Sequence, residues 1–402
     1  MQLLTYTSLY PSSAQAQHGI FVENRLRHIT ALPGINSRVM APVPWFPLSG
    51  PGFGRYGCYA TISDREERYG IDIRHPRYLV IPKIGMSMAP WLMYRGTKRM
   101  AAALCRDQVG FDVIDAHYFY PDGVAAAMLG RLLGRPVVIS ARGTDVNLLP
   151  DFALPRRQIL WAAEQASAII AVSEALKQRM IDIGIAAEKI SVLRNGVDSD
   201  LFAPADREAV RSELGLTKPT MVAVGNVLAT KGQDIAIRAL TILDDTELLI
   251  VGRGADESAF KTLAQSLGVA DRVHFVGRVK QEDLARYFSA ADVSLLASVR
   301  EGWPNVLLES MSCGTPVVAS NVGGVPEIIT RSEPGRIMPE RTPEALAEAV
   351  RSLRAEAPDR QAVRAYAEGF GWDETARAQA DLYAGVVSGF SPGMARPVPS
   401  FS

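Results

Sequence analysis

Two glutamates separated by eight positions, Glu301 and Glu309, are the first residues of this chain whose types and spacing suggest chemistry. The stretch between them contains Gly302 and Pro304, and both residue types disfavour a helix interior. Proline fits the first position of a helix, where a missing N–H costs nothing. The pattern therefore predicts Glu301 in a strand-to-helix loop and Glu309 more than one turn into the helix that follows.

This loop and helix together suggest one kind of ligand. The unpaired N–H groups at a helix start, here around Trp303 to Val306, attract a phosphate. Carboxylates repel phosphate but accept hydrogen bonds from hydroxyl groups. A ligand with sugars on both sides of a diphosphate, a nucleotide sugar, satisfies both requirements. The alternative is that Glu301 merely caps the helix and Glu309 is a solvated surface residue.

The elements that must position these residues alternate between short β-rich runs and helical patterns, which predicts an α/β protein with doubly wound parallel sheets. The expected strands lie at 3–8, 37–42, 112–117, 136–141 and 168–173, and then at 220–225, 247–252, 272–277, 292–297 and 316–320. The expected helices lie at 21–32, 122–133, 232–243, 256–267 and 281–290, and the pattern after 342 is helical. The segment 43–100 gives no clear assignment.

The alternation restarts once, which predicts two Rossmann-like domains that face each other across a cleft. The expected divisions are a first domain at 1–200, a second domain at 201–371, a helix at 372–389 and a disordered tail at 390–402. The family resemblance given below implies that the first domain binds the acceptor, that the second binds the nucleotide sugar, and that the helix at 372–389 crosses back to the first domain. The polar run 195–208 contains Gly and Pro and is the best candidate for the linker.

Composition indicates a globular protein, with 48% hydrophobic and 21% charged residues and no net charge. Residues 1–200 carry 22 Lys and Arg against 17 Asp and Glu, and the remainder carries 21 against 26. This basic half suits an anionic substrate or the anionic surface of a membrane, unless it is ordinary scatter of charge. Cys58, Cys105 and Cys313 have no metal-ligand or disulfide spacing. With no signal peptide pattern, we expect a cytoplasmic protein, peripheral at most on the inner face of the plasma membrane.

The sequence also resembles the retaining GT-B glycosyltransferases of group 1, or family 4. The motifs are E-x7-E at Glu301 and Glu309, with EGWPN at its start, and the segments CGTPVV and GGVPE that follow. The amino-terminal PSSAQAQHGIFVENRL and SARGTDVNLLP are similar to a bacterial subset that acts on surface polysaccharides, including relatives of a teichuronic-acid enzyme. The resemblance implies a hexosyltransferase-like enzyme that uses a nucleotide sugar and a glycan or polyprenyl-linked acceptor, with no cofactor, no metal and no nucleic acid.

The resemblance also assigns roles to residues. Glu301 contacts hydroxyls of the donor sugar, and Glu309 binds the ribose. The family pattern G-R-x4-K-G becomes Gly225 to Gly232 here, with Lys231 as the phosphate ligand and charge stabiliser and Asn226 in place of the arginine. Arg300 and Arg142 are candidates to replace that arginine. The loop residues that approach the donor through their backbone are Gly302, Trp303, Pro304, Asn305 and Val306.

In the first domain, Gly19 is expected to let the backbone approach the leaving phosphate. His117 lies where relatives place a residue that faces the acceptor, and its alternative is a satisfied buried ring. Arg142 replaces a family histidine in SARGTD and suits an anionic acceptor or a donor phosphate. Asp145 either orients Arg142 or caps the next helix, and Arg278 is expected to border the nucleotide base. We thus predict Lys231, Glu301, His117 and Arg142 as catalytic.

Two further features complete the prediction. The only D-x-D, at Asp198 and Asp200, lies in the expected linker and is interpreted as a turn rather than a metal site. Two other functions remain open: a nucleotide-sugar 2-epimerase of the same architecture, and an inactive subunit that only binds the sugar nucleotide.

Overall fold

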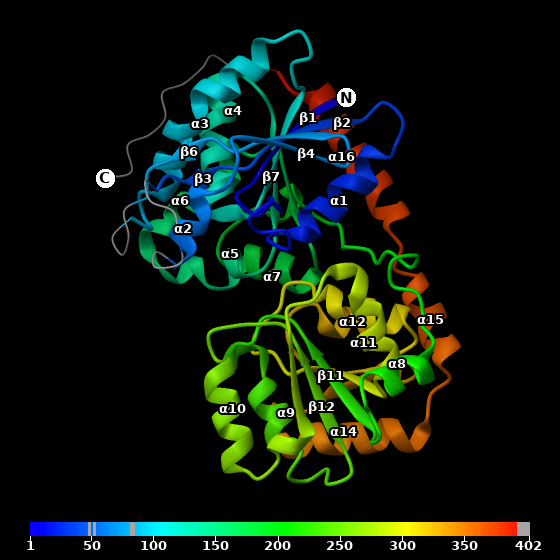
Figure 1. Cartoon of the computed structure of the whole chain (residues 1–402). Coiled ribbons are helices and arrows are strands. Elements are labelled where there is room, and N and C mark those ends of the chain that lie inside the picture. Colours follow the sequence, from blue (N-terminus) through cyan, green and yellow to red (C-terminus); the bar gives the residue numbers. More distant parts are fainter. Residues whose placement is uncertain (47–49, 51–53, 81–84, 392–402) are drawn as a thin grey trace. The chain divides into compact units, whose positions relative to one another are not determined.

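The computed structural model describes residues 1–46, 50, 54–80 and 85–391 and divides the chain into two compact units (Figure 1). The first unit comprises Met1–Arg194 together with the chain from Asp373, and the second comprises Asn195–Trp372. Each unit contains its own parallel sheet, so the α/β class with two doubly wound domains is confirmed. Apart from Phe390 and Ser391, the predicted tail lies outside the described residues.

The sheet of the first unit has eight strands in the order β10-β9-β8-β7-β1-β2-β5-β4. All neighbours in this sheet are parallel except β4, which pairs antiparallel with β5. The central strands are buried on both faces, as expected for parallel strands that helices cover. The strands are β1 (Gln2–Tyr6), β2 (Asn36–Met40), β4 (Arg65–Arg68), β5 (Ile71–Arg74), β7 (Val113–His117), β8 (Val137–Ala141), β9 (Ala168–Ala171) and β10 (Ile190–Val192).

The segment 43–100, which the sequence pattern does not assign, supplies β4 and β5 to this sheet. It contains the short parallel pair β3 (Val43–Pro44) and β6 (Arg77–Tyr78). Gly96 lets the long helix α3 approach this pair, because a Cβ at Gly96 would lie 2.7 Å from the Arg77 carbonyl oxygen. The helices of this unit are α1 (Ile20–Thr30), α2 (Gly54–Ala60), α3 (Ala89–Arg106), α4 (Val124–Leu133), α5 (Thr144–Asn147), α6 (Ala153–Gln165) and α7 (Glu174–Asp182).

The last helix, α16 (Trp372–Gly389), returns to the first unit as predicted. Its Tyr383 is fully buried in the core formed by strands of the first sheet and by α1. Two hydrogen bonds fix the helix there: Arg25 Nε donates to Gln379 Oε1 at 2.6 Å, and Thr375 Oγ1 donates to the Arg194 carbonyl at 2.9 Å.

The second unit is built on a six-stranded, all-parallel sheet in the order β13-β12-β11-β14-β15-β16. The predicted strands are present, and one strand that the sequence analysis does not predict, β16, extends the edge beside β15. The strands are β11 (Thr220–Val224), β12 (Glu247–Val251), β13 (Val273–Gly277), β14 (Val293–Leu296), β15 (Val317–Ser320) and β16 (Gly335–Met338).

Helices cover this second sheet, and the predicted linker 195–208 belongs to the unit rather than lying between domains. Val197 N–H donates to the Phe370 carbonyl at 2.9 Å, and Gly196 packs against the backbone of Gly371 and Trp372. The helices are α8 (Arg207–Glu213), α9 (Gln233–Ala239), α10 (Glu257–Ser266), α11 (Leu284–Ala290), α12 (Asn305–Ser312), α13 (Val325–Ile328), α14 (Pro343–Glu356) and α15 (Arg360–Glu368).

Candidate functional site

The strand order of the second unit decides where its site residues meet. Strands β12 and β13 follow β11 in the chain and lie on one side of it. Strands β14, β15 and β16 come next in the chain and lie on the other side of β11. At such a reversal the loops after the two central strands diverge and leave a place for a ligand. Lys231 lies in the segment after β11 and Glu301 in the segment after β14, so the topology brings both to this switch point.

Lys231 and Glu301 form an ion pair across this switch point. Lys231 Nζ lies 2.6 Å from Glu301 Oε1, although 70 residues separate them in the sequence. Lys231 ends the short 3-10 turn Ala229–Lys231, which precedes Gly232 and α9. The lysine side chain is 32% exposed and the glutamate 12% exposed. A ligand can therefore reach both charges from solvent.

Glycines allow the chain segments around Lys231 and Glu301 to approach each other closely. A Cβ at Gly232 would lie 2.1 Å from the Ala297 carbonyl oxygen, and one at Gly323 would lie 2.0 Å from the Glu301 carbonyl oxygen. Gly324 N–H also donates to the Gly302 carbonyl at 3.1 Å. The GG of the GGVPE segment is thus a support for the loop that carries Glu301.

The loop that follows Glu301 differs in detail from the prediction. Helix α12 begins at Asn305, so Pro304 is its N-cap residue and not its first helical residue. Asn305 N–H already donates to the Trp303 carbonyl at 3.1 Å, and this donor is therefore engaged within the loop. Val306, in the first turn, is half-buried.

Trp303 and Asn305 anchor the loop through their side chains. The Trp303 ring is 7% exposed, packs against Phe370 at 6.3 Å between ring centroids, and donates through Nε1 to the Asn195 carbonyl at 3.0 Å. The Asn305 carboxamide accepts from Asn195 Nδ2 at 3.1 Å. The Trp303 ring therefore packs beneath the loop, and only its backbone is left for contact with a donor.

Glu309 is half-buried in the second turn of α12. Its carboxylate accepts no hydrogen bond and forms no ion pair within the described part of the chain. Burial raises the pKa of Glu309 to about 7, against an ordinary value of 4.5. A carboxylate that lacks protein partners is suited to accept hydrogen bonds from a ligand.

Three other predicted residues of this unit are exposed: Asn226, Arg278 and Arg300. Their side chains make no hydrogen bond or ion pair with the residues described. Asn226 lies in a loop whose backbone is held by the loop after β12, since Val227 N–H donates to the Arg253 carbonyl at 3.1 Å. The structure thus leaves all three side chains available, but it does not bring them against Lys231 or Glu301.

The predicted turn at the D-x-D is confirmed. Asp198 Oδ1 accepts from Asp200 N–H at 3.2 Å and from Leu201 N–H at 3.0 Å, which is an Asx turn. In the described ranges, no three His, Cys, Asp or Glu side chains are grouped so that they could hold a metal ion.

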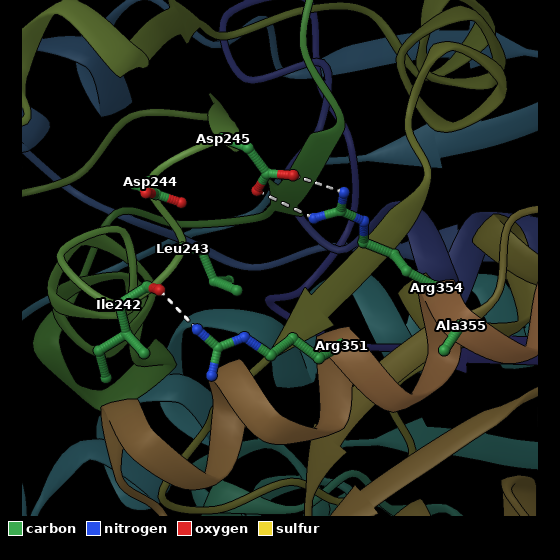
Figure 2. Close-up of a pocket in the computed structure, with 7 residues that line it drawn as sticks. All are labelled: Ile242, Leu243, Asp244, Asp245, Arg351, Arg354 and Ala355. Atoms are coloured by element: carbon green, nitrogen blue, oxygen red, sulfur yellow. Dashed lines mark hydrogen bonds and ion pairs between the residues drawn. The ribbon is translucent and has the colours of Figure 1, made fainter.

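A hollow of about 440 Å³ on the second unit contains none of the predicted site residues. Figure 2 shows that its arginines are occupied: Arg354 forms two hydrogen bonds with the Asp245 carboxylate, and Arg351 donates to the Ile242 carbonyl at 2.7 Å. These contacts attach α14 to the loop before β12. The hollow is therefore a product of packing between α14 and that loop.

In the first unit, Gly19 lies at the switch point between β1 and β7. It is the N-cap of α1 with φ of 70°, and a Cβ there would lie 2.3 Å from the Leu9 carbonyl carbon. Only glycine fits such a close approach in the left-handed region. The contact with the leaving phosphate stays a prediction, since the chain's own packing already requires this glycine.

His117 and Arg142 meet each other, but inside the first unit. His117 is 1% exposed, its Nε2 lies 2.9 Å from Asp115 Oδ2, and the Arg142 guanidinium contacts its Nδ1. Burial lowers the pKa of His117, which keeps the ring neutral with its proton directed at Asp115. The satisfied buried ring is therefore the placement that the structure gives, and contact with an acceptor stays a prediction.

Arg142 is also constrained by burial. Burial, together with nearby Arg25, lowers its pKa to about 9, so it remains a cation at neutral pH. Asp145 accepts hydrogen bonds from the backbone N–H groups of Arg142 and Gly143, at 3.1 and 2.7 Å. Asp145 thus fixes the loop that carries Arg142, and burial raises its pKa.

Two acidic residues of this region are missing from the prediction. Asp115 lies two positions before His117 on β7, and side chains two apart on a strand share a face, so their pairing was readable from VIDAH. Asp122 is fully buried beside the loop after β1 and accepts from the Ser8 hydroxyl at 3.1 Å and from the Ser8 backbone. Burial raises the pKa of Asp122 to about 7.

Ser8 also borders a pocket of about 190 Å³ in the first unit. Its wall combines aromatic rings with hydrogen-bonding groups, which is a composition suited to a polar ligand with apolar faces. Among the residues that line it are Ser8, Tyr10, Gln15, His18, Tyr59 and Tyr78. The sequence pattern does not predict this pocket, because its wall combines the loops after β1 and β2 with β3, β6 and α2, which are distant in the chain.

None of the helices in the described ranges is both long and apolar enough to cross a membrane.

Comparison with known proteins identifies the family. Residues 58–201 match the family model "Glycosyltransferase Family 4", and residues 206–370 match "Glycosyl transferases group 1". The putative teichuronic acid biosynthesis glycosyltransferase TuaC of Bacillus subtilis is 30% identical over 369 residues, which cover 87% of this chain and 88% of that protein. A D-inositol 3-phosphate glycosyltransferase of Mycobacteroides abscessus is 36% identical over 211 residues, which span only 48% of its length.

Solved structures agree in fold. Sucrose-phosphate synthase of Thermosynechococcus elongatus matches 96% of this chain and 99% of its own with a TM-score of 0.78 and 21% identity. Anabaena HepE, solved in complex with UDP, matches 96% of this chain and all of its own with a TM-score of 0.73 and 21% identity. The GT-B fold class is confirmed, and the chain belongs to the group 1, or family 4, glycosyltransferases.

Proposed function

We propose that this chain is a retaining, metal-independent glycosyltransferase that transfers a sugar from a nucleotide-diphosphate sugar to a hydroxyl of a glycan or lipid-linked acceptor in cell-surface polysaccharide synthesis. The observation that carries the proposal is the Lys231–Glu301 pair at the switch point of the second sheet, 2.6 Å between charged atoms. In the proposal, Lys231 is the cation for phosphate and Glu301 is the acceptor for sugar hydroxyls, and the two residues lie on loops that begin at neighbouring strands.

In this proposal the donor lies along the segment from Lys231 to α12. Lys231 leaves Glu301 and pairs with the diphosphate, the freed Glu301 carboxylate accepts from sugar hydroxyls, and Glu309 accepts from the ribose. The backbone of Gly302–Val306 and the exposed Asn226, Arg278 and Arg300 are the further donor contacts. The HepE structures with UDP and UDP-glucose support a donor of this class.

The proposed reaction breaks the bond between the anomeric carbon and the diphosphate oxygen, and the acceptor oxygen bonds to that carbon from the same face. The acceptor's proton passes to the departing diphosphate, so no external acid or base is consumed. The chain's part is to neutralise charge on the leaving group through Lys231 and the loop amides. No metal is required in this scheme, because the protein supplies the cation.

The acceptor is assigned to the first unit. The aromatic and polar pocket beside Ser8 offers stacking surfaces and hydrogen-bond partners, which suit a sugar. His117 and Arg142 contact each other inside the first unit, near the switch point between β1 and β7, and we propose that this buried pair helps to position the acceptor. The name of the B. subtilis relative supports an acceptor from surface-polysaccharide synthesis.

Inositol phosphate is a second candidate acceptor. Several relatives are named D-inositol 3-phosphate glycosyltransferases, and one of them is 33% identical over 68% of this chain. The cationic Arg142 is the feature of this chain that favours a phosphorylated acceptor. It is buried, however, and the glycan acceptor therefore remains the primary proposal.

A two-step experiment tests the function. Nucleotide sugars are first screened by thermal shift, since a bound donor stabilises the folded protein by mass action. The donor that binds is then incubated with candidate acceptors, and free nucleotide and the anomeric configuration of the product are measured. We expect nucleotide release that depends on acceptor, with the configuration of the donor retained.

Each other outcome identifies a rival. Conversion of the donor to its 2-epimer without acceptor would indicate an epimerase. Binding of donor with no turnover in the presence of any acceptor would indicate an inactive binding subunit. An inverted product would refute retention while leaving the transferase assignment in place.

A further inference from the structure

Helix α3 of the first unit carries positive charge without any compensating acid. Its 18 residues include Arg95, Lys98, Arg99 and Arg106 and no Asp or Glu. The buried side of the helix includes Met93, Thr97, Ala101 and Leu104. The opposite side exposes Trp91, Arg95, Arg99 and Arg106, which repeat at helical spacing.

Large apolar side chains are exposed directly before this cationic face. Met86 is 43% exposed, Met88 45% and Trp91 41%. The backbone that carries them is fixed, since Tyr120 Oη donates to the Met86 carbonyl at 2.6 Å and Gln158 Nε2 donates to the Ser87 carbonyl at 3.1 Å. The apolar residues are therefore held at the surface by contacts with the rest of the unit.

Of the charges in this region, Arg95 and Arg99 are exposed, and Lys98 is half-buried with its ammonium 5.8 Å from the centroid of the Tyr94 ring. Arg95, Lys98 and Arg99 form no ion pair within the residues described. Arg95 instead lies over the Trp91 ring, 5.0 Å from its centroid. We use "the α3 face" for the six residues Met86, Met88, Trp91, Arg95, Lys98 and Arg99. Figure 1 shows α3 on the side of the first unit that also carries α4, α2 and the β3–β6 pair.

We infer that the α3 face docks this protein onto a membrane surface rich in anionic lipid. Arginine and lysine pair with lipid phosphates and are attracted to the negative surface potential, at about 1 kcal/mol per charge. Tryptophan and methionine beside them enter the boundary between headgroups and acyl chains, where an amphipathic ring is most stable. A soluble polyanion would use the cations but would leave Met86, Met88 and Trp91 in water, so the combination favours lipid. This inference is independent of which sugar or acceptor the enzyme uses.

The test uses the full chain and vesicles of phosphatidylcholine with and without phosphatidylglycerol. We expect cosedimentation only with the anionic vesicles and weaker binding at high salt. Arg95→Gln with Arg99→Gln should lower the partition coefficient about 30-fold, the ratio that corresponds to two charges at roughly 1 kcal/mol each. The matched control is Lys218→Gln with Arg238→Gln, two exposed cations of the second unit, which should change binding little.

Tryptophan fluorescence supplies the second readout. The chain has five tryptophans, and brominated lipid should quench the one that enters the bilayer. We expect quenching in the unmodified protein and its loss in Trp91→Phe, which keeps an apolar ring. Absence of binding to anionic vesicles would overturn the inference, as would an equal loss in the control pair. Binding without quenching, or quenching that persists in Trp91→Phe, would also overturn it, because the contact would then be purely ionic or made by another surface.

Discussion

At the scale of single residues, Lys231 is the cation that the proposed reaction assigns to the leaving diphosphate. It pairs with Glu301, and its side chain is partly exposed to solvent. Such a pair contributes at most about 1 kcal/mol to stability, because solvent screens it. In the proposed function, the ion pair holds the Lys231 ammonium at the position where the diphosphate leaves.

Lys231→Ala should therefore lower kcat by about 10²-fold or more, the scale seen when a charge stabiliser is removed. Thermal unfolding should change little, since the lost ion pair is partly exposed. Lys218→Ala, which removes an exposed lysine elsewhere in the same unit, is the control. Near-normal turnover of the Lys231 variant would exclude this residue from the site.

Substitutions of Glu301 and Glu309 should have different effects on the binding of free nucleotide and of intact donor. If Glu309 binds the ribose, Glu309→Gln weakens both the free nucleotide diphosphate and the intact donor by roughly 10-fold or more, the scale of one lost charge-assisted hydrogen bond. Glu301→Gln should weaken only the donor, because only the donor carries the sugar that Glu301 contacts. Titration calorimetry with both ligands measures this, and equal damage to nucleotide binding by both variants contradicts the assignment.

The raised pKa of Glu309 also predicts a pH dependence. Burial raises its folded-state pKa to about 7 from 4.5, so folding favours the protonated form, and the associated stability is lost as pH rises from about 4.5 through 7. Ribose hydroxyls need the ionised form, so donor affinity should fall as pH drops through about 7. Glu309→Gln should unfold at a higher temperature than the unmodified protein at pH 8 and lose this pH dependence of donor binding. The intact donor is the suitable ligand, because its diphosphate diester does not titrate near neutral pH.

At the scale of elements, the site depends on how closely the loops after β11, β14 and β15 approach one another. Glycines allow these approaches, and Gly323 is the clearest case because its φ is 50° and a Cβ would overlap the Glu301 carbonyl. The helices contribute less directly: α12 fixes Glu309, while Trp303 and Asn305 attach its start to Asn195.

Gly323→Ala should thus destabilise the second unit by about 1–3 kcal/mol and reduce turnover by displacing Glu301. Gly268→Ala is a matched control, since Gly268 has φ of 69° but nothing within 4 Å of its Cβ position. Both variants lose stability because alanine is strained at a positive φ. Only Gly323→Ala adds a steric clash between the new Cβ and the Glu301 carbonyl. Chemical denaturation and steady-state kinetics of the pair separate the two terms, and identical behaviour would show that Glu301 does not depend on this contact.

At the scale of the whole molecule, two units each supply one switch point with its own set of polar side chains. The second carries the Lys231–Glu301 pair, and the first carries the buried Asp115–His117–Arg142 group together with the buried Asp122, which binds Ser8. The C-terminal helix α16 completes the first unit, and its Tyr383 lies in the same core as the strands that bear this group.

We expect sugar transfer by this protein to require no divalent metal. The only D-x-D of the chain is an Asx turn, and the proposed cation for the leaving group is Lys231. Activity should persist after exhaustive chelation and in the double variant Asp198→Asn, Asp200→Asn. Loss of activity with chelator and its return with magnesium or manganese would mean that a metal performs the role assigned to Lys231.

The sequence by itself determined the local features of this protein. Alternating strand and helix patterns depend on residues close together in the chain, so the ten predicted strands and the position of Glu301 and Glu309 around the start of α12 were readable from it. The D-x-D turn was readable for the same reason, because an Asx turn joins residues two and three positions apart. The segment 43–100 was not, since β3 and β6 are too short to have a period of their own and exist only because they pair with each other.

The tertiary structure decided what depends on contacts between distant residues. Lys231 meets Glu301 because β11 pairs with β14, and a pairing between strands about 70 residues apart leaves no periodic signal in either strand. The same holds for His117, which the sequence analysis predicts to face the acceptor in preference to being a buried ring. The pairing of β7 with β8 brings Arg142 against it inside the unit. Burial, and with it the raised pKa of Glu309 and Asp122, is a property of all the chain segments that surround a side chain, so no local stretch of sequence could specify it.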